Sequence, residues 1–215
     1  YESVFEYVRK HVKPERDSNA RESYRRLWWQ HVEARPAMRG ALHGLRRFLC
    51  TTRVAKHRLF VWQESPTLPD SATFAFARDD DYFFGVLHSR AHELWGLKLG
   101  TRLETRPRYT PTTCFETFPF PEPTDKQQSA IAEAARELDR LRTNWLNPPE
   151  WTRTETLTFP GSVDGPWARY VHDAKGGIGT VRYPRIVAKD DECAKELKKR
   201  TLTNLYNQRP AWLDL

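Results

Sequence analysis

The chain contains 215 residues, of which 39% are hydrophobic and 29% are charged, and its formal net charge at pH 7 is +7. This length allows one large domain or two small ones, and without an apolar run of about 18 residues or a basic-then-apolar leader we expect neither a membrane span nor secretion. The positive charge favours a polyanionic partner such as nucleic acid, although many basic proteins bind nothing acidic.

The N-terminal part is rich in arginine and in aromatic residues with helical spacing, and Pro36 interrupts it. We predict helices over residues 1–11, 18–34 and 37–48. From Cys50 onward the pattern becomes typical of strands, with β-rich runs at residues 58–62 and 71–77 separated by a turn at 66–70. These runs predict the edge of a small sheet.

Three consecutive aspartates, Asp79 to Asp81, predict the start of a helix, because carboxylates cap a helix N-terminus and interact favourably with its dipole. We expect this helix to continue to about Leu99 and to end at Gly100. Prolines recur between residues 107 and 123, so this stretch is expected to form loops and short strands. Loops of this kind often carry recognition residues.

A capping box at Thr124 to Gln127 and apolar residues at helical spacing predict an amphipathic helix from about residue 125, closed by Pro148 and Pro149. Residues 150–190 are rich in glycine and proline without a clear period, so we expect an ordered loop or a partly disordered insertion there. A last helix is expected over residues 191–207.

Together these elements predict an α+β fold class. We expect a mixed domain over residues 1–123, with a small sheet, packed helices and a helical lead-in. A helical C-terminal segment over residues 124–215 would follow it and would contain the loop at about 150–190.

One long stretch of the chain is basic without any acidic residue, between Glu33 and Glu64. Aromatic residues alternate with its charges, an arrangement suited to a strand or helix edge that rests on a sugar-phosphate backbone. A solvated basic face would explain the same charges without DNA. The basic side chains of this stretch are Arg35, Arg39, Arg46, Arg47, Arg53, Lys56 and Arg58.

A second candidate surface lies at residues 102–113, where forked donors and short hydroxyls surround a proline-stiffened loop. Arginine can bind guanine in a bidentate manner, and threonine or tyrosine can bond phosphates. Alternatively, Arg108 and the threonine pair tie the loop to the core, in which we place Phe115, Phe118 and Phe120. The candidate DNA-binding residues of both surfaces are Arg46, Arg47, Arg53, Lys56, His57, Arg58, Arg102, Arg106, Arg108, Tyr109, Thr110, Thr112 and Thr113.

Residues 106–121 read RPRYTPTTCFETFPFP, and stretches at 52–62, 81–95 and 196–213 accompany them in order. In these stretches the chain resembles the C-terminal target-recognition region of class I S-adenosylmethionine-dependent DNA adenine-N6 methyltransferases of restriction-modification and phage-defence systems, including fused type II enzymes. In that family a methyl-transfer domain precedes this region. The resemblance, and a start at Tyr1 rather than Met, imply a fragment of a longer protein.

Catalytic chemistry is not expected within this segment. Asn147-Pro148-Pro149 is followed by Glu150 and not by the aromatic residue that grips a flipped adenine in the family, so it is interpreted as a helix stop. His88 and His92 stand four residues apart on a predicted helix, but no third metal ligand is evident, and packing explains them. Gly176 to Gly179 follows no apolar strand, and the Glu196-Leu197-Lys198 triplet lacks a nearby Pro-Asp pair.

The three cysteines, Cys50, Cys114 and Cys193, are far apart in the sequence. This spacing favours neither a metal knuckle nor a disulfide framework, and the odd number fits a reducing cytoplasm.

The resemblance implies that the chain holds double-stranded DNA, reads a short sequence and presents an adenine to the methyltransferase domain of the same protein. That domain, and not this segment, would bind S-adenosylmethionine, so we expect the segment alone to be inactive as an enzyme. The alternative is a protein-interaction module without DNA binding, in which Trp28, Trp29, Trp95 and Trp145 contact another subunit.

Overall fold

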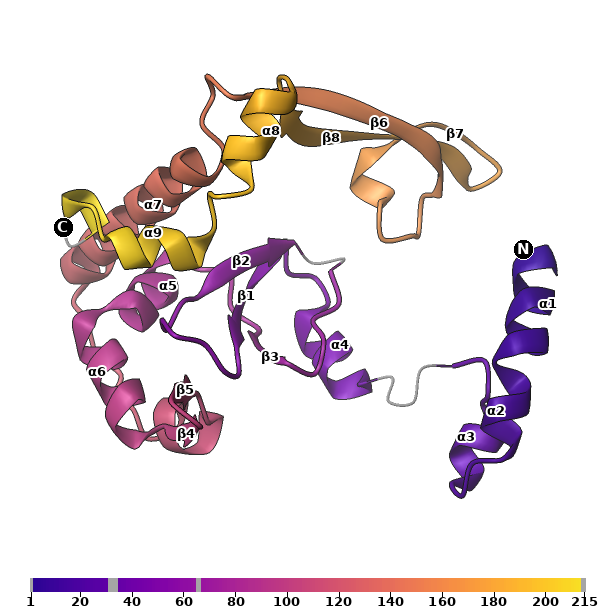
Figure 1. Ribbon diagram of the computed structural model, residues 1–215, viewed down its shortest axis with the longest axis horizontal. Coiled ribbons are helices and arrows are strands. Elements are labelled where there is room, and N and C mark those ends of the chain that lie inside the picture. The colour runs from indigo at the N-terminus through magenta and orange to yellow at the C-terminus, as the bar shows by residue number, and fades with distance from the viewer. Residues whose placement is uncertain (1, 31–34, 65–66, 214–215) are drawn as a thin grey trace. The chain divides into compact units, whose positions relative to one another are not determined.

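The computed structural model describes residues 2–30, 35–64 and 67–213, and it divides into two compact units, Tyr1–His43 and Gly44–Leu215. Helices and small antiparallel sheets occur together, which confirms the α+β fold class (Figure 1). The division predicted at residue 123 falls inside the second unit, where α7 (Asp125–Leu146) packs against α5 (Asp81–His88) across it.

The first unit consists of short helices: α1 (Glu2–His11), α2 (Lys13–Asp17), α3 (Glu22–Arg26) and α4 (Pro36–Leu42). The helix predicted over residues 1–11 is confirmed. The one predicted over 18–34 is shorter, and its residues 31–34 lie outside the described residues. The helix predicted over 37–48 ends early, because Gly44 takes a left-handed φ of 84° and the chain then enters a strand.

The second unit is built on a three-stranded antiparallel sheet in the order β2-β1-β3. Its strands are β1 (Arg47–Thr52), β2 (Val61–Glu64) and β3 (Thr73–Phe76). The central strand β1 is buried from Phe48 to Thr51, and Leu49 pairs with Trp62 on one side and with Phe76 on the other. The predicted small sheet is therefore present, with its most buried strand in the middle.

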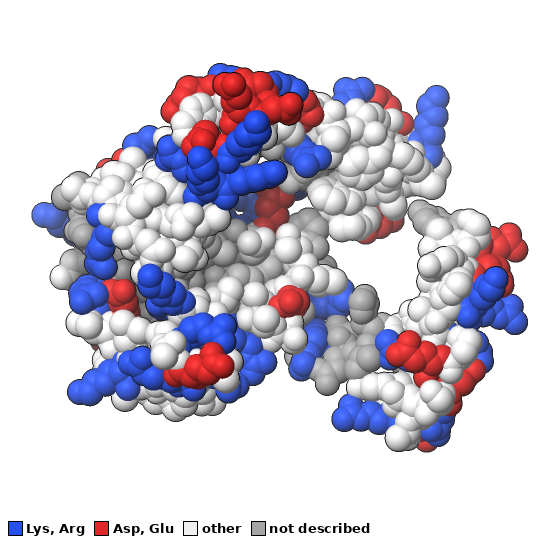
Figure 2. Space-filling model, viewed as in Figure 1, with Lys and Arg blue, Asp and Glu red and all other residues white. Residues whose placement is uncertain are grey.

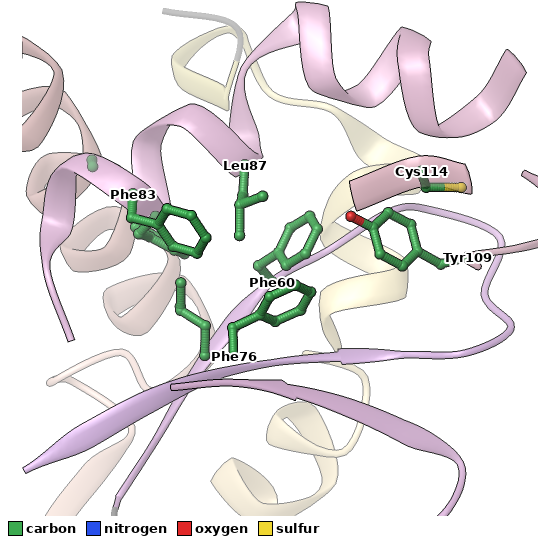
Figure 3. Close-up of a cluster of buried hydrophobic side chains, with 9 residues drawn as sticks. Phe60, Phe76, Phe83, Leu87, Tyr109 and Cys114 are labelled. Carbon is green, nitrogen blue, oxygen red and sulfur yellow. The ribbon is translucent and has the colours of Figure 1, made fainter. Parts of the chain in front are cut away.

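A core of aromatic rings lies between this sheet and α5 (Figure 3). Phe60 has no exposed surface, and its ring centroid lies 5.7 Å from that of Phe76 and 5.9 Å from that of Tyr109. Helix α5 contributes Phe83 and Leu87 to the same cluster. This core supports the segment that follows α6 (Arg90–Leu99).

The single helix predicted from Asp79–Asp81 to Leu99 is two helices, because Ser89 interrupts it. Ser89 has extended backbone angles, and its side chain accepts a hydrogen bond from the His92 amide as the N-cap of α6. The two predicted ends are confirmed, since Asp80 caps α5 and Gly100 is the C-cap of α6.

Helix α7 begins with the predicted capping box of Thr124 and Gln127. It packs closely on α5 at Gly85, where an added Cβ would lie 2.7 Å from Ile131 Cγ2 and 3.2 Å from Ala135 Cβ. The absence of a side chain at residue 85 therefore sets how closely the two helices approach. Among the residues that the structure describes, no helix is long and apolar enough to cross a membrane.

We expect Gly85→Ala to lower the free energy of unfolding by about 1 kcal/mol, because overpacking costs roughly 1–3 kcal/mol and the higher helix propensity of alanine offsets about 1 kcal/mol. Urea denaturation measures the change. Gly40→Ala in α4 is the control, since nothing lies within 4 Å of its added Cβ. An equal loss in both variants would contradict the close contact.

The prediction of a loop or insertion over residues 150–190 was wrong. These residues form an antiparallel sheet in the order β6-β8-β7, with β6 (Thr152–Ser162), β7 (Val171–Lys175) and β8 (Ile178–Ala188). Thr152 pairs with Ala188, so the ladder depends on residues far apart in sequence. Pro160 and Pro184, which suggested a loop, lie in strands that pair along their whole length.

The last predicted helix, over residues 191–207, is also divided. It consists of α8 (Asp191–Leu197) and α9 (Leu202–Gln208), and Thr201 caps the second of them. The remaining short elements are β4 (Thr101–Leu103), β5 (Arg106–Arg108), and the helical turns η1 (Pro111–Phe115), η2 (Ala168–Tyr170) and η3 (Ala211–Leu213).

Candidate nucleic-acid interface

The β4–β5 hairpin is an exposed ribbon that carries three of the predicted DNA-binding arginines. Its register pairs Arg102 with Pro107 and Leu103 with Arg106. Because paired residues of antiparallel strands share a face, Leu103, Arg106 and Arg108 lie on one face and Arg102 lies on the other. All three arginines are exposed, and Figure 2 shows Lys and Arg side chains gathered over this hairpin.

The tip of the hairpin carries Glu104, which is not among the residues predicted from the sequence. Its φ is +57°, and its carboxylate pairs with the Arg106 guanidinium at 3.0 Å. Two-residue hairpin turns usually place glycine where φ is positive, so a glutamate there is held at some conformational cost. The sequence does offer a signal that could have identified Glu104, because it is the one carboxylate between Arg102 and Arg106.

The base of the hairpin is hydrogen-bonded to the segment that follows β1. The Tyr109 amide donates to the Arg53 carbonyl at 2.8 Å, and the Ala55 amide donates to the Pro107 carbonyl at 3.2 Å. An added Cβ at Gly100 would lie 2.7 Å from the Arg108 carbonyl oxygen, so only glycine permits this approach. The arginines therefore project from an anchored element and not from a free loop.

An open groove of about 460 Å³ lies beside the hairpin, lined among others by Thr52, Arg53, Ser71, Leu103 and Arg108. Arg53 donates from Nη1 to the Ser71 carbonyl at 3.0 Å. The structure thus brings Arg53 of the first basic stretch together with Arg108 of the second, although 54 intervening residues separate them in the sequence.

Two of the residues predicted to contact DNA are buried in the structure. Tyr109 is only 1% exposed, and its hydroxyl lies 3.1 Å from His92 Nε2. Arg58 is 9% exposed, donates to the Thr51 hydroxyl at 2.9 Å, and lies over the Tyr109 ring at 4.9 Å. Residues along an extended segment alternate between faces, so the exposure of Arg108 places Tyr109 inside. We assign both side chains to the core behind the groove.

The remaining residues of the first basic stretch lie elsewhere. Arg47 pairs with Asp81 at 2.7 Å and stacks over the Trp62 ring at 3.7 Å. It begins the six-residue strand β1, whose other end is near Arg53, so the two are separated by roughly 20 Å. The structure does not bring Arg46, which precedes Arg47, to the hairpin, and a DNA contact at either residue stays a prediction.

Lys56 and His57 contact helix α9. The Lys56 ammonium donates to Asn207 Oδ1 at 2.7 Å, and His57 Nε2 lies 2.9 Å from the same oxygen. These contacts hold the segment after β1 against the C-terminal part of the unit. DNA binding by Lys56 and His57 also stays a prediction.

The threonines after the hairpin form the π-helical turn η1. The amides of Thr113 and Cys114 both donate to the Thr110 carbonyl, at 3.1 and 2.8 Å. This arrangement supports the alternative that Thr110 and Thr113 shape the loop, whereas Thr112 is exposed and makes no such contact.

Among the phenylalanines assigned to the core, Phe118 is 9% exposed and Phe120 is 36% exposed, so Phe120 is only partly covered.

His88 and His92 take part in core hydrogen bonds, as the packing interpretation predicted. His92 Nδ1 lies 2.9 Å from the Leu87 carbonyl, so Nδ1 carries the proton and Nε2 accepts from Tyr109. His88 Nε2 lies 3.1 Å from an Arg142 guanidinium nitrogen. Within the described ranges, no group of three potential metal ligands is found.

Burial lowers the pKa of His88 to about 3 and that of His92 to about 4, and the nearby guanidiniums of Arg142 and Arg58 add to these shifts. A histidine with a lowered folded-state pKa binds fewer protons folded than unfolded, so stability rises with pH between the two values. We expect the free energy of unfolding to fall by roughly 2 kcal/mol for His92 alone between pH 7 and pH 5.

Thermal unfolding across this pH range measures the effect. His92→Asn should show a shallower fall than the unsubstituted chain, whereas the exposed His172→Asn should leave it unchanged. Equal slopes for all three proteins would contradict the assignment to the buried imidazole.

Comparisons with known proteins relate part of this chain to restriction-modification DNA methyltransferases, as the sequence resemblance predicted. The matching family model is the target recognition domain of MmeI, and it covers residues 57–122. These residues include α5, α6, the hairpin and η1.

One curated relative is DNA methyltransferase A of Bacillus subtilis (strain 168), 39% identical over 61 residues that cover 28% of this chain and 7% of the relative. A solved structure, the type IIL restriction-modification enzyme MmeI in complex with DNA, is similar with a TM-score of 0.54 at 22% identity, covering 66% of this chain and 19% of that chain. The second likeness shows the fold alone. The chain spans less than a fifth of the length of either protein.

Proposed function

We propose that this chain reads a short duplex DNA sequence for an adenine-N6 DNA methyltransferase of a restriction-modification or phage-defence system. A methyl-transfer domain of the same cytoplasmic protein would bind S-adenosylmethionine and flip the adenine out of the stack. The observation that carries this proposal is the exposed β4–β5 hairpin, anchored inside the stretch that matches the target-recognition family model.

The shape of the hairpin suits the major groove. That groove is about 12 Å wide and admits a two-stranded β-ribbon, where base edges present distinct donor and acceptor patterns. Strands lie about 4.8 Å apart, which leaves room for side chains on both sides of the ribbon. Arg102, Arg106 and Arg108 then supply forked donors at the depth of the bases or of the flanking phosphates.

The charge at the tip supports base reading over simple phosphate binding. A carboxylate is repelled by phosphates, yet it accepts a hydrogen bond from the amino group of cytosine. Glu104, at 3.0 Å from Arg106, thus makes a donor and acceptor pair that complements a C·G base pair. A hairpin that only tracked the backbone would gain nothing from this glutamate.

Selection of duplexes from a randomised pool tests the proposal, with the full chain as bait at a fixed salt concentration. Enrichment of one short motif would support sequence recognition, and Glu104→Gln should relax the preference at one base pair. Glu116→Gln, an exposed acidic control outside the hairpin, should leave the motif unchanged. A pool that stays random after selection would contradict the proposal.

The protein-interaction alternative has less support from the tryptophans of the second unit. The Trp95 indole donates to the Thr117 hydroxyl at 3.2 Å, and the Arg200 guanidinium covers the Trp145 ring at 4.8 Å. Trp28 is 9% exposed, which leaves Trp29, at 50%, as the most accessible of the four. A partner that bound through these rings would show little dependence on salt.

A further inference from the structure

The groove beside the hairpin has the chemistry of an anion site. Its lining includes the Arg53 and Arg108 side chains and the hydroxyl-bearing residues Thr52 and Ser71, and it contains no acidic residue. We propose that this groove is a clamp for one phosphodiester of the DNA backbone, held jointly by Arg53 and Arg108. The inference rests on the proposed function and adds to it a contact that fixes the position of the hairpin along the duplex.

A buried cation beneath the groove strengthens this assignment. The Arg58 guanidinium donates to the Thr51 hydroxyl and to the carbonyl of Thr52, which lines the groove. Within the described part of the chain, no carboxylate lies within 4.0 Å of this guanidinium. A buried charge without a counterion is costly, and an anion in the groove would offset part of that cost.

Arg58 remains charged in spite of its burial. Desolvation lowers its pKa to about 10, so the guanidinium carries its proton at neutral pH. Two carboxylates are next to groove residues in sequence: Glu104 pairs with Arg106 at 3.0 Å, and Asp70 accepts from the Ala72 amide at 2.6 Å. That bond shapes the turn before β3 and leaves the groove positive.

The two backbone segments that carry the clamping arginines are hydrogen-bonded to each other. Val54 and Arg108 form an antiparallel bridge, and the Tyr109 amide bonds to the Arg53 carbonyl at 2.8 Å. The stack of Arg53 over Phe74, at 5.4 Å, limits its side chain further. A phosphate bound here would therefore meet a preformed site, which is how phosphate contacts fix the register of a protein on a duplex.

Arg53→Ala, Arg108→Ala and the double variant test the clamp, by fluorescence anisotropy with a duplex across a salt series. Each single variant should weaken binding on the order of 10-fold for every duplex sequence, and should reduce the slope of log K against log salt by about 0.9. Because one phosphate is shared, the double variant should reduce the slope by about 0.9 as well and not by about 1.8.

Arg140→Ala is the matched control, since this exposed arginine lies on α7 and should leave the slope unchanged. Additive losses in the double variant, or a loss confined to one base pair of the target, would overturn the shared clamp. Unchanged binding in both single variants would overturn it too, while leaving DNA recognition by the rest of the hairpin intact.

A second measurement separates failure of the clamp from failure of DNA recognition. The side-chain NMR resonances of Arg53 and Arg108 are identified by their disappearance in Arg53→Ala and Arg108→Ala. Titration of the full chain with inorganic phosphate should shift these two resonances but not that of Arg140. Shifts without duplex binding would support the anion site and contradict the proposed function. Duplex binding without shifts, together with unchanged variants, would overturn the clamp alone.

Discussion

Replacement of Arg102, Arg106 and Arg108 by alanine is expected to weaken binding to the preferred duplex on the order of 100-fold or more, because each base or phosphate contact contributes about 1–3 kcal/mol. The three side chains are exposed and lie on an anchored hairpin, so their removal should change binding without unfolding the core. Anisotropy with the selected duplex gives the affinity, and circular dichroism reports whether the fold persists.

A triple variant of equal charge is the control for that experiment. Arg140, Arg153 and Arg182 are exposed and each pairs with a nearby carboxylate outside the hairpin. Their replacement by alanine removes the same net charge, so it isolates position from overall charge. Equal loss of affinity in the two triple variants would mean that the net charge, and not the hairpin, binds DNA.

Phe60→Ala is expected to have the largest effect on stability, a loss of about 3–5 kcal/mol, because it removes a large buried ring and leaves a cavity. Phe60 is fully buried and its ring lies 5.5 Å from His92 and 5.6 Å from His88, in addition to its contacts with Phe76 and Tyr109. Since Tyr109 directly follows the hairpin, the loss should also loosen the base of the interface.

Chemical denaturation measures the loss, with Phe120→Ala as the comparison. Phe120 belongs to the same aromatic region but is 36% exposed, so its truncation should cost only about 1–2 kcal/mol of transfer free energy. Similar losses for the two variants would show that the core does not centre on Phe60.

Local signals allowed much of the helical structure to be predicted from the sequence. The Thr124 capping box and the Gly100 stop each depend on residues within one helical turn, and both are confirmed. The break at Ser89 is also local, but a serine inside an apolar helical pattern is compatible with both a continuous helix and a cap. The sequence pattern alone did not distinguish them.

The sheet at residues 152–188 could not be predicted in the same way, because its stability comes from pairing between distant residues. Thr152 meets Ala188 only after the chain has turned twice, and prolines at 160 and 184 resemble loop signals. Burial is low along β6, which removes the alternation that indicates a strand. The structure explains this sheet through pairing and not through local propensity.

The residue types of the candidate site could be chosen from the sequence, but their arrangement in space could not. Arg53 and Arg108 were both selected from the sequence, but their meeting in one groove depends on the bridge at Val54. Tyr109 and Arg58 were selected for their chemical type, and the fold places both behind the surface. Along an extended segment, packing in the core decides which residues face inward. The sequence pattern at these positions did not show which residues those are.

Fluorescence anisotropy of the full chain with a labelled random-sequence duplex, across a salt series, tests the central claim most directly. We expect micromolar or tighter binding at low salt that weakens steeply as salt rises, because guanidiniums that contact phosphates release condensed counterions. Absence of binding at the lowest salt, or binding that does not depend on salt, would contradict it.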